Sequence, residues 1–115
     1  MAKRYDLEDR AQQFAIDVRK FVRVLKLDIW NRENAKQVVR SSGSVGENYI
    51  EANEKLGDKD FKFRAKIARK EAKESRYWLG IIDTLGDSDV ELTRIVLLQE
   101  EDELLKILSA IINKS

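Results

Sequence analysis

The sequence predicts an all-α protein, an antiparallel up-down-up-down four-helix bundle, and three observations lead to this fold class. First, the 115-residue chain contains no proline, the residue that most strongly breaks helices. Second, apolar residues recur at three- and four-residue steps over four long stretches. Third, short connections join these stretches, which makes successive helices antiparallel neighbours. We expect residues 1–115 to form a single domain with helices over about residues 7–27, 34–55, 59–85 and 89–113.

The first helix is predicted from a single apolar face, which is formed by Leu7, Phe14, Val18, Phe21 and Leu25. The segment DIWNREN, residues 28–34, then interrupts the helical pattern. Because asparagine is a favoured N-cap residue, Asn31 or Asn34 is expected to begin the second helix.

The second helix contains an unusual stretch, VVRSSGSVGENYIEAN, with three serines and two glycines. A helical period nevertheless persists through it, with Val38 and Tyr49 on one face and Arg40 on the other, so we predict a helix. Each glycine costs about 1 kcal/mol relative to alanine. We therefore expect a neighbouring helix to approach closely over Ser42, Gly43 and Gly46. The glycine spacing and the Lys-Ser/Thr pair of a P-loop are absent, which argues against a nucleotide site.

A glycine-containing connection precedes the third helix, with Gly57 suited to a left-handed C-cap and Asp58 to an N-cap. This helix carries two apolar stripes, and one stripe is enough for the core of a lone bundle. The core stripe is Phe61, Ala65, Ala68, Ala72, Ser75, Leu79 and Ile82. The second stripe is predicted to form an oligomer interface, with the filling of an irregular core as the alternative. Its residues are Phe63, Ile67, Trp78, Ile81 and Leu85.

The fourth helix follows the connection GDSDVE, in which Ser88 and Glu91 have the spacing of a capping box. Apolar residues cover about half of its circumference, more than the roughly 100° stripe of an ordinary surface helix. This surplus also favours a homo-oligomer.

The composition excludes much catalytic chemistry. The chain has no cysteine and no histidine, so it has no disulfide, thiolate ligand, cysteine nucleophile or imidazole base. An all-carboxylate metal site is the remaining possibility, and we interpret its candidate acids as solvated or ion-paired. These acids are Glu47, Glu51, Glu54, Glu71 and Glu74. We predict no catalytic residue, no metal and no cofactor. The charged N-terminus and the lack of a long apolar run predict a cytoplasmic protein with no membrane segment.

The charge distribution is uneven although the formal net charge is only +1. Residues 59–76 contain eight Lys/Arg and three Asp/Glu, whereas residues 87–103 contain seven Asp/Glu and one Arg. The basic segment could contact an RNA backbone, or it could face an acidic helix of its own chain or of a neighbour. The candidate nucleic-acid contacts are Lys59, Lys62, Lys66, Arg69, Lys70, Lys73 and Arg76.

Residues 38–82 closely resemble the bacterial four-helix-bundle protein family, also called the 23S rRNA intervening-sequence protein family. The family pattern Arg-Ser-x-x-Ser-(Val/Ile)-x-x-Asn-(Tyr/Ile)-x-Glu-Ala is matched by Arg40, Ser41, Ser44, Val45, Asn48, Tyr49, Glu51 and Ala52. A second run is matched by Phe61, Ile67, Ala68, Glu71, Glu74, Tyr77, Trp78 and Leu79. Glu47 departs from the pattern, because the family more often has alanine there.

The resemblance implies an antiparallel four-helix bundle that assembles into a homopentamer, in a family whose molecular function is not established. A distantly related bundle is a pentameric accessory protein that binds a reverse transcriptase and nucleic acid. Together with the residues, this suggests a non-catalytic binding or scaffolding protein whose partner is structured RNA or a nucleic-acid enzyme. The alternatives are a purely structural self-assembling oligomer and a carboxylate metal enzyme.

Overall fold

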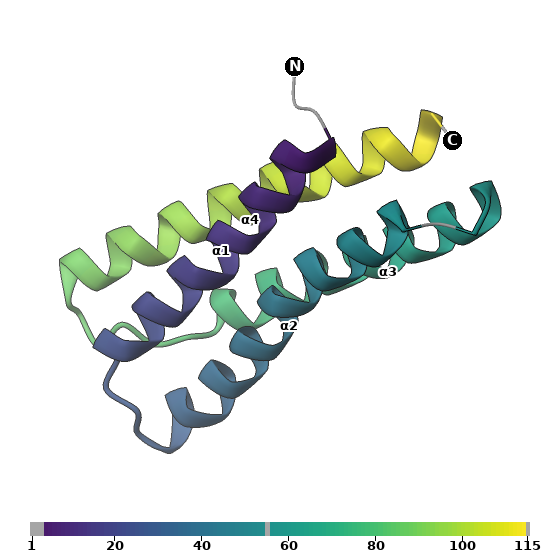
Figure 1. The fold of residues 1–115 in the computed structure, drawn as a ribbon. Helices are drawn as coiled ribbons and strands as arrows, with labels where there is room; N and C mark the ends of the chain where they lie inside the picture. Colours follow the sequence, from purple (N-terminus) through teal and green to yellow (C-terminus); the bar gives the residue numbers. More distant parts are fainter. Residues whose placement is uncertain (1–3, 55, 115) are drawn as a thin grey trace.

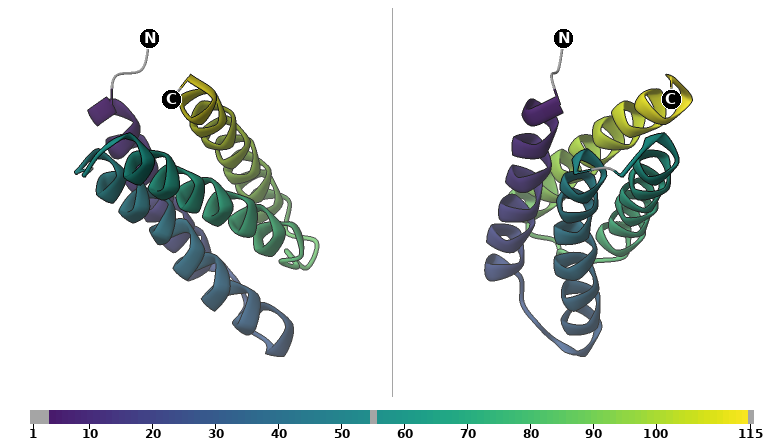
Figure 2. Two further views of the ribbon diagram at one scale, coloured as in Figure 1. Left: turned by 90° about the vertical axis from the view of Figure 1, so that its right-hand side faces the viewer. Right: turned by 45° about the vertical axis from the view of Figure 1, so that its right-hand side comes forward.

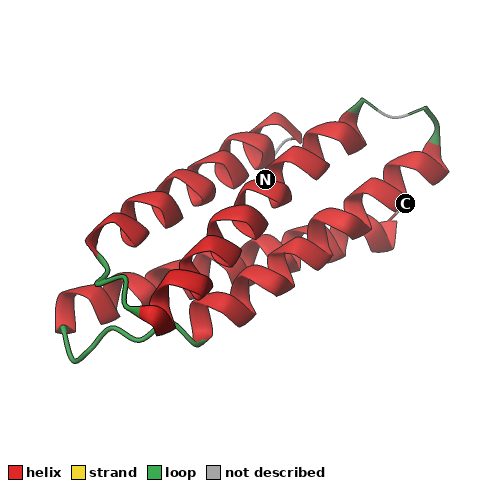
Figure 3. Cartoon of the chain, turned by 90° about the horizontal axis from the view of Figure 1, so that it is seen from below, coloured by secondary structure: helices red, strands yellow, loops and turns green. Residues whose placement is uncertain are grey.

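The computed structural model describes residues 4–54 and 56–114, and in this part of the chain it contains four helices and no strand (Figures 1 and 3). The helices are α1 (Arg4–Val24), α2 (Ile29–Asn53), α3 (Asp58–Gly80) and α4 (Ser88–Lys114). Each helix packs against its neighbours in the chain, and α1 also packs against α4. Each helix therefore packs against two others around the bundle, which confirms the predicted all-α up-down four-helix bundle. Figure 2 shows α4 crossing α1 obliquely.

The core lies between the four helices and uses the apolar faces that the sequence predicts. Phe14, Val18 and Phe21 of α1 are fully buried, as are Leu104 and Leu108 of α4. The side of α3 that faces the core is narrower, because alanines occupy three of its buried positions, namely Ala65, Ala68 and Ala72.

The serine- and glycine-containing stretch is helical throughout, as predicted, and α1 is the helix that approaches it. A Cβ atom on Gly46 would lie 3.3 Å from the Cβ of Ala11 in α1. At Gly43 it would meet only the guanidinium of Arg19, the flexible end of a side chain, at 3.4 Å. The close contact predicted for this region is therefore located at Gly46.

The predicted helix ends at the first connection are wrong by several residues. α1 ends at Val24, and α2 already begins at Ile29, because the side chain of Asp28 accepts a 2.8 Å hydrogen bond from the backbone N–H of Asn31. Asp28 is thus the N-cap. Asn31 and Asn34, the predicted caps, are buried residues within α2.

The other two connections differ from the prediction in a similar way. Glu54 is the C-cap of α2, and Gly57, at φ +136°, occupies the N-cap position of α3 in place of Asp58. α3 ends at Gly80 instead of Leu85, which has a left-handed φ of +53°. Before α4, Asp87 Oδ1 accepts hydrogen bonds from the N–H groups of residues 89 and 90, so Asp87 performs the capping predicted for Ser88.

Asn31 forms hydrogen bonds with two connections at one end of the bundle, the α1–α2 connection and the α3–α4 connection. Its amide nitrogen donates to the carbonyls of Lys26, at 3.1 Å, and Asp83, at 2.7 Å. Its oxygen accepts from the backbone N–H of Asp83 at 2.9 Å. Trp30 and Asn34 add hydrogen bonds to the carbonyl of Ile81, at 2.7 and 3.3 Å. One buried amide therefore fixes the position of two loops that are far apart in the sequence.

Candidate nucleic-acid interface

The seven predicted nucleic-acid contacts form one face of α3, which we call the basic face. At 100° per residue they fall within an arc of about 120°. Lys59, Lys66, Lys70 and Lys73 are exposed, whereas Lys62 and Arg69 are half-buried. Within the described part of the chain, none of these six residues forms an ion pair. They therefore keep positive charge at the surface without a direct ion pair among the described residues, although Lys70 also attracts Glu74 within α3.

Arg76, the seventh residue of the basic face, is held by α4. Its Nε lies 3.4 Å from Glu101 Oε1, and its terminal nitrogen lies 3.5 Å from Asp102 Oδ1. Its side chain is still 52% exposed. Arg76 thus joins the basic face to the acidic segment of α4.

Glu101 is an unusual member of that acidic segment because it is fully buried. Neither of its carboxylate oxygens has a hydrogen-bond partner among the described residues. Burial raises the pKa of Glu101 to about 7, although the positive charge of Arg76 acts in the opposite direction. A carboxyl group in this setting changes its charge near neutral pH.

The remaining acids of α4 are mostly engaged within their own chain. Arg10 of α1 donates to both oxygens of Glu100, at 2.7 and 2.8 Å, and also contacts Glu103. Arg94 pairs with Glu91 within α4 at 2.8 Å. The acidic segment is therefore neutralised mainly by arginines outside the basic face. Among the seven residues of the basic face, only Arg76 forms an ion pair with a described acid of this segment.

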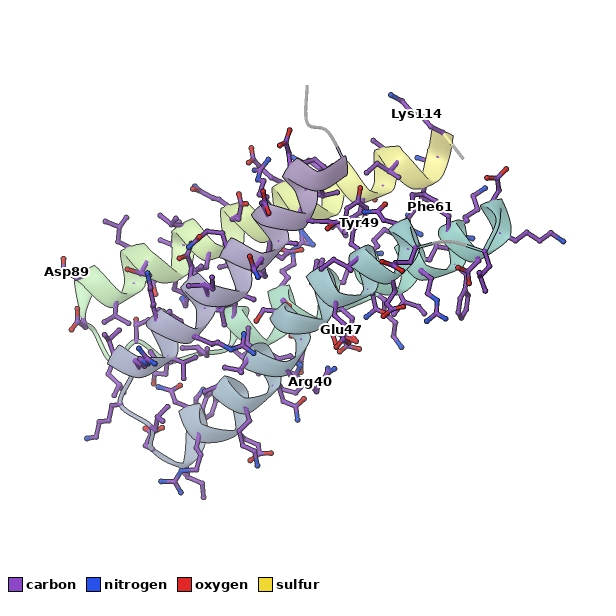
Figure 4. The ribbon with its side chains drawn as sticks, in the orientation of Figure 1. Arg40, Glu47, Tyr49, Phe61, Asp89 and Lys114 are labelled. Atoms are coloured by element: carbon purple, nitrogen blue, oxygen red, sulfur yellow. The ribbon has the colours of Figure 1, made fainter. Side chains whose placement is uncertain are left out.

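A second polar cluster lies between α2 and α3. Arg40, which projects from the same side of α2 as Glu47 in Figure 4, donates to Glu74 at 2.6 Å and to Glu71 at 3.4 Å. Burial, together with the hydrogen bond to Glu74, raises the pKa of Glu71. Burial would also raise the pKa of Glu74, but hydrogen bonds from Arg40 and Glu71 lower it.

The two serines beneath this cluster connect the same helices. The Ser75 hydroxyl donates to the carbonyl of Glu71 at 3.0 Å, and the buried hydroxyls of Ser41 and Ser75 share a hydrogen bond of 2.9 Å. Two small hydroxyl side chains let the helices pack closely while satisfying each other's hydrogen bonds. The cluster therefore has a structural role in joining α2 to α3.

Comparison with known proteins supports the relationship that these motifs suggest. The family model described as 23S rRNA-intervening sequence protein matches residues 3–110. The chain belongs to this family. A similar solved structure is the crystal structure of a protein of unknown function from the S23 ribosomal protein family of Bacteroides thetaiotaomicron. Its sequence is 28% identical to this chain, and the two structures superpose with a TM-score of 0.77. The match covers 92% of this chain and 97% of the Bacteroides chain. No curated protein matches the chain.

In this member of the 23S rRNA-intervening sequence protein family, the family-motif residues have mainly structural positions. Arg40, Ser41 and Glu71 belong to the α2–α3 cluster, and the carbonyl of Ser44 accepts a hydrogen bond from Asn48 at 2.8 Å. Tyr49 is buried in the core (Figure 4), and Trp78 packs against the core and, edge-on, against Tyr77. Glu51 is exposed.

The predicted oligomer interface does not form one continuous stripe. Phe63, Ile81 and Leu85 are exposed, whereas Ile67 and Trp78 are half-buried. Ile81 and Leu85 follow the end of α3 and lie in the connection to α4.

Sequence reasoning missed most of the exposed apolar residues at the end of the bundle where the α1–α2 and α3–α4 connections meet. We call this region the apolar end. Its exposed residues are Val24, Leu27, Ile29, Trp30, Ile81, Leu85, Leu92, Ile95 and Val96. The available signal was the presence of Leu27, Ile29 and Trp30 at and just after the predicted end of the first helix, three large apolar residues with no predicted place in the core.

An apolar groove of about 370 Å³ lies between α1 and α2. Its lining includes the apolar residues Val22, Leu27 and Val39 and the cations Arg32, Lys36 and Arg40. Among the described residues, no group of acids is arranged to hold a metal ion. No described helix has the length and apolarity needed to cross a membrane.

Proposed function

We propose that this protein is a non-catalytic, cytoplasmic, homo-oligomeric scaffold that binds structured RNA through the basic face of α3. The observation that carries the proposal is the row of six basic side chains that no acid of the described chain pairs with. Unpaired lysines and arginines on one face release counterions when they contact phosphates, which favours binding to a polyanion.

The dimensions and chemistry of the basic face suit a nucleic-acid duplex or hairpin. Residues 59–73 span about 21 Å along the helix axis, enough to contact several phosphates. Double-stranded RNA is recognised mostly by its shape and backbone, which such a row of charges can read without base-specific contacts. Phe63 and Tyr77, 60% and 61% exposed, lie on the same helix and could stack on unpaired bases.

The apolar end supports self-association. Its Leu92, Ile95 and Val96 lie within the acidic segment of α4, whereas the groove between α1 and α2 is apolar and flanked by Arg32 and Lys36. Both surfaces are apolar, so packing one against the other would remove apolar area from water. Because they are different surfaces of one chain, their pairing would be head-to-tail, which closes into a ring when the rotation allows it. A pentameric ring is the arrangement that the family resemblance implies.

The test compares two triple charge reversals that change the net charge equally. The first, Lys66→Glu, Arg69→Glu and Lys73→Glu, disrupts the basic face. The matched control, Lys20→Glu, Arg23→Glu and Lys26→Glu, reverses exposed cations on α1 and in the first connection. RNA affinity is measured by fluorescence anisotropy over a range of salt concentrations.

We expect the α3 variant to lose RNA binding and the control to keep most of it. The slope of log affinity against log salt should fall by about 2–3 in magnitude, since each lost phosphate contact removes roughly 0.7–0.9. Equal affinity and salt slope in the wild type and the α3 variant would refute the proposal.

A purely structural oligomer is the second candidate. The nine exposed apolar residues of the apolar end favour it. It predicts that the wild-type protein self-associates but binds no RNA at low salt. A nucleic-acid enzyme as partner would instead be detected by binding of that enzyme to the oligomer without RNA.

A further inference from the structure

We infer that RNA binding to the basic face is coupled to the uptake of a proton by Glu101, the buried carboxyl group of α4 that contacts Arg76. This inference rests on the proposed function and adds a regulation of the same site. It makes the affinity for RNA dependent on pH in the range where cells operate.

Glu101 is buried where only one cation, Arg76, pairs with its carboxylate among the described residues. It is 0% exposed and lies one turn from two buried leucines, Leu97 and Leu104. Arg76 Nε is 3.4 Å away, an ion-pair distance, yet the two carboxylate oxygens have no hydrogen bond within the described chain. An ionised carboxylate without hydrogen-bond donors and away from water is strongly disfavoured unless a cation stays beside it.

The other charged groups around this site have partners of their own. From α1, Arg10 is engaged with Glu100 and Glu103. From α4 itself, Asp102 contacts Arg76 at 3.5 Å but also contacts Lys106 at 3.0 Å. If Arg76 is withdrawn, Asp102 keeps a cation and its access to water. Glu101, which is fully buried, would then have no cation beside it and no contact with water.

A phosphate bound at Arg76 would therefore act on Glu101 in either of two ways. It could draw the half-exposed guanidinium toward solvent, or it could add a negative charge nearby. Both effects favour the protonated form of a carboxyl group. Because burial already raises the pKa of Glu101 to about 7, a further rise makes the group take up a proton at neutral or slightly alkaline pH.

The experiment is isothermal titration calorimetry of the full-length protein with a short double-stranded RNA at about pH 7.5, where the free carboxyl group is largely ionised. Titrations in two buffers with different heats of ionisation give the number of protons taken up. We expect about 0.5–0.75 proton for the wild type, since about one-quarter of the free carboxyl groups are already protonated at this pH. Glu101→Gln should bind RNA without proton uptake, whereas Asp102→Asn, the neighbouring control, should retain it. The wild-type affinity should fall by up to about tenfold per pH unit above neutrality.

The outcomes separate this inference from the proposed function. RNA binding whose heat is the same in both buffers would overturn the coupling and leave the proposed function intact. Equal proton uptake by the wild type and Glu101→Gln would also overturn it, because the proton would then go elsewhere. An absence of RNA binding would overturn the proposed function, and this inference with it.

Discussion

Replacing Glu101 with glutamine should make the folded protein more stable at alkaline pH and leave its stability almost unchanged at acid pH. Glutamine has the shape of the protonated acid but carries no charge. In the folded state the pKa of Glu101 is raised from 4.5 to about 7, so the folded protein binds more protons than the unfolded chain between these values. Stability therefore falls as pH rises through this window, and the loss is complete above pH 7.

The size of this effect follows from the pKa shift. A shift of one pKa unit corresponds to 1.36 kcal/mol, so the wild type should lose about 3 kcal/mol between the two ends of the window. Urea unfolding at several pH values measures it, as the difference in unfolding free energy between the variant and the wild type. Taking this difference cancels the contribution of Glu74 and Glu91, whose lowered pKa values make stability fall at acid pH instead.

The control for this prediction is Glu47→Gln, which replaces an exposed carboxylate on α2. Its difference from the wild type should stay within about 0.5 kcal/mol at every pH, as is usual for surface substitutions. A pH-independent difference for Glu101→Gln, or a wild type that gains stability relative to the variant as pH rises, would refute the assignment of a buried, proton-binding Glu101.

Three further experiments test the packing and the proposed assembly. Asn31→Ala should lower the free energy of unfolding by about 2–4 kcal/mol, because it removes three part-buried hydrogen bonds to the backbone of two loops, whereas Asn34→Ala should cost about 1 kcal/mol. Urea unfolding distinguishes them, and equal losses would contradict the special role of Asn31. Gly46→Val should destabilise by about 1–3 kcal/mol through its clash with α1, so an unchanged thermal midpoint would show that the helices can separate freely. The pair Leu92→Arg and Val96→Arg should produce a folded monomer by light scattering, and an unchanged oligomer would exclude this part of α4 from the interface.

The positions of the helices could be predicted from the sequence because each depends on a repeated pattern. The stretch around Gly43 and Gly46 illustrates this, since its helical period indicates the correct structure despite five residues that favour loops. The helix ends could not be predicted as well. Asp28 and Asn31, or Asp87 and Ser88, are nearly equivalent as caps, and only the folded structure decides which side chain reaches the free N–H groups.

The electrostatics of the site could be predicted only in part. The sequence indicates which side of α3 is basic, but it cannot indicate that Arg76 is paired while its six neighbours are unpaired. Glu101 was missed because a charged residue is normally assigned to the surface. Its spacing from Leu97, Leu104 and Leu108 places it on the core face, and this periodicity was the signal available.

The most direct test of the central claim is to map which lysines RNA protects. The protein is acetylated briefly with and without a short double-stranded RNA, and the modification of each lysine is quantified by mass spectrometry. We predict protection of the basic-face lysines, namely Lys59, Lys62, Lys66, Lys70 and Lys73, with Lys20 on α1 and Lys36 on α2 unchanged. Protection that is uniform over the surface, or strongest at Lys20 and Lys36, would contradict the assignment of the basic face of α3 as the RNA-binding surface.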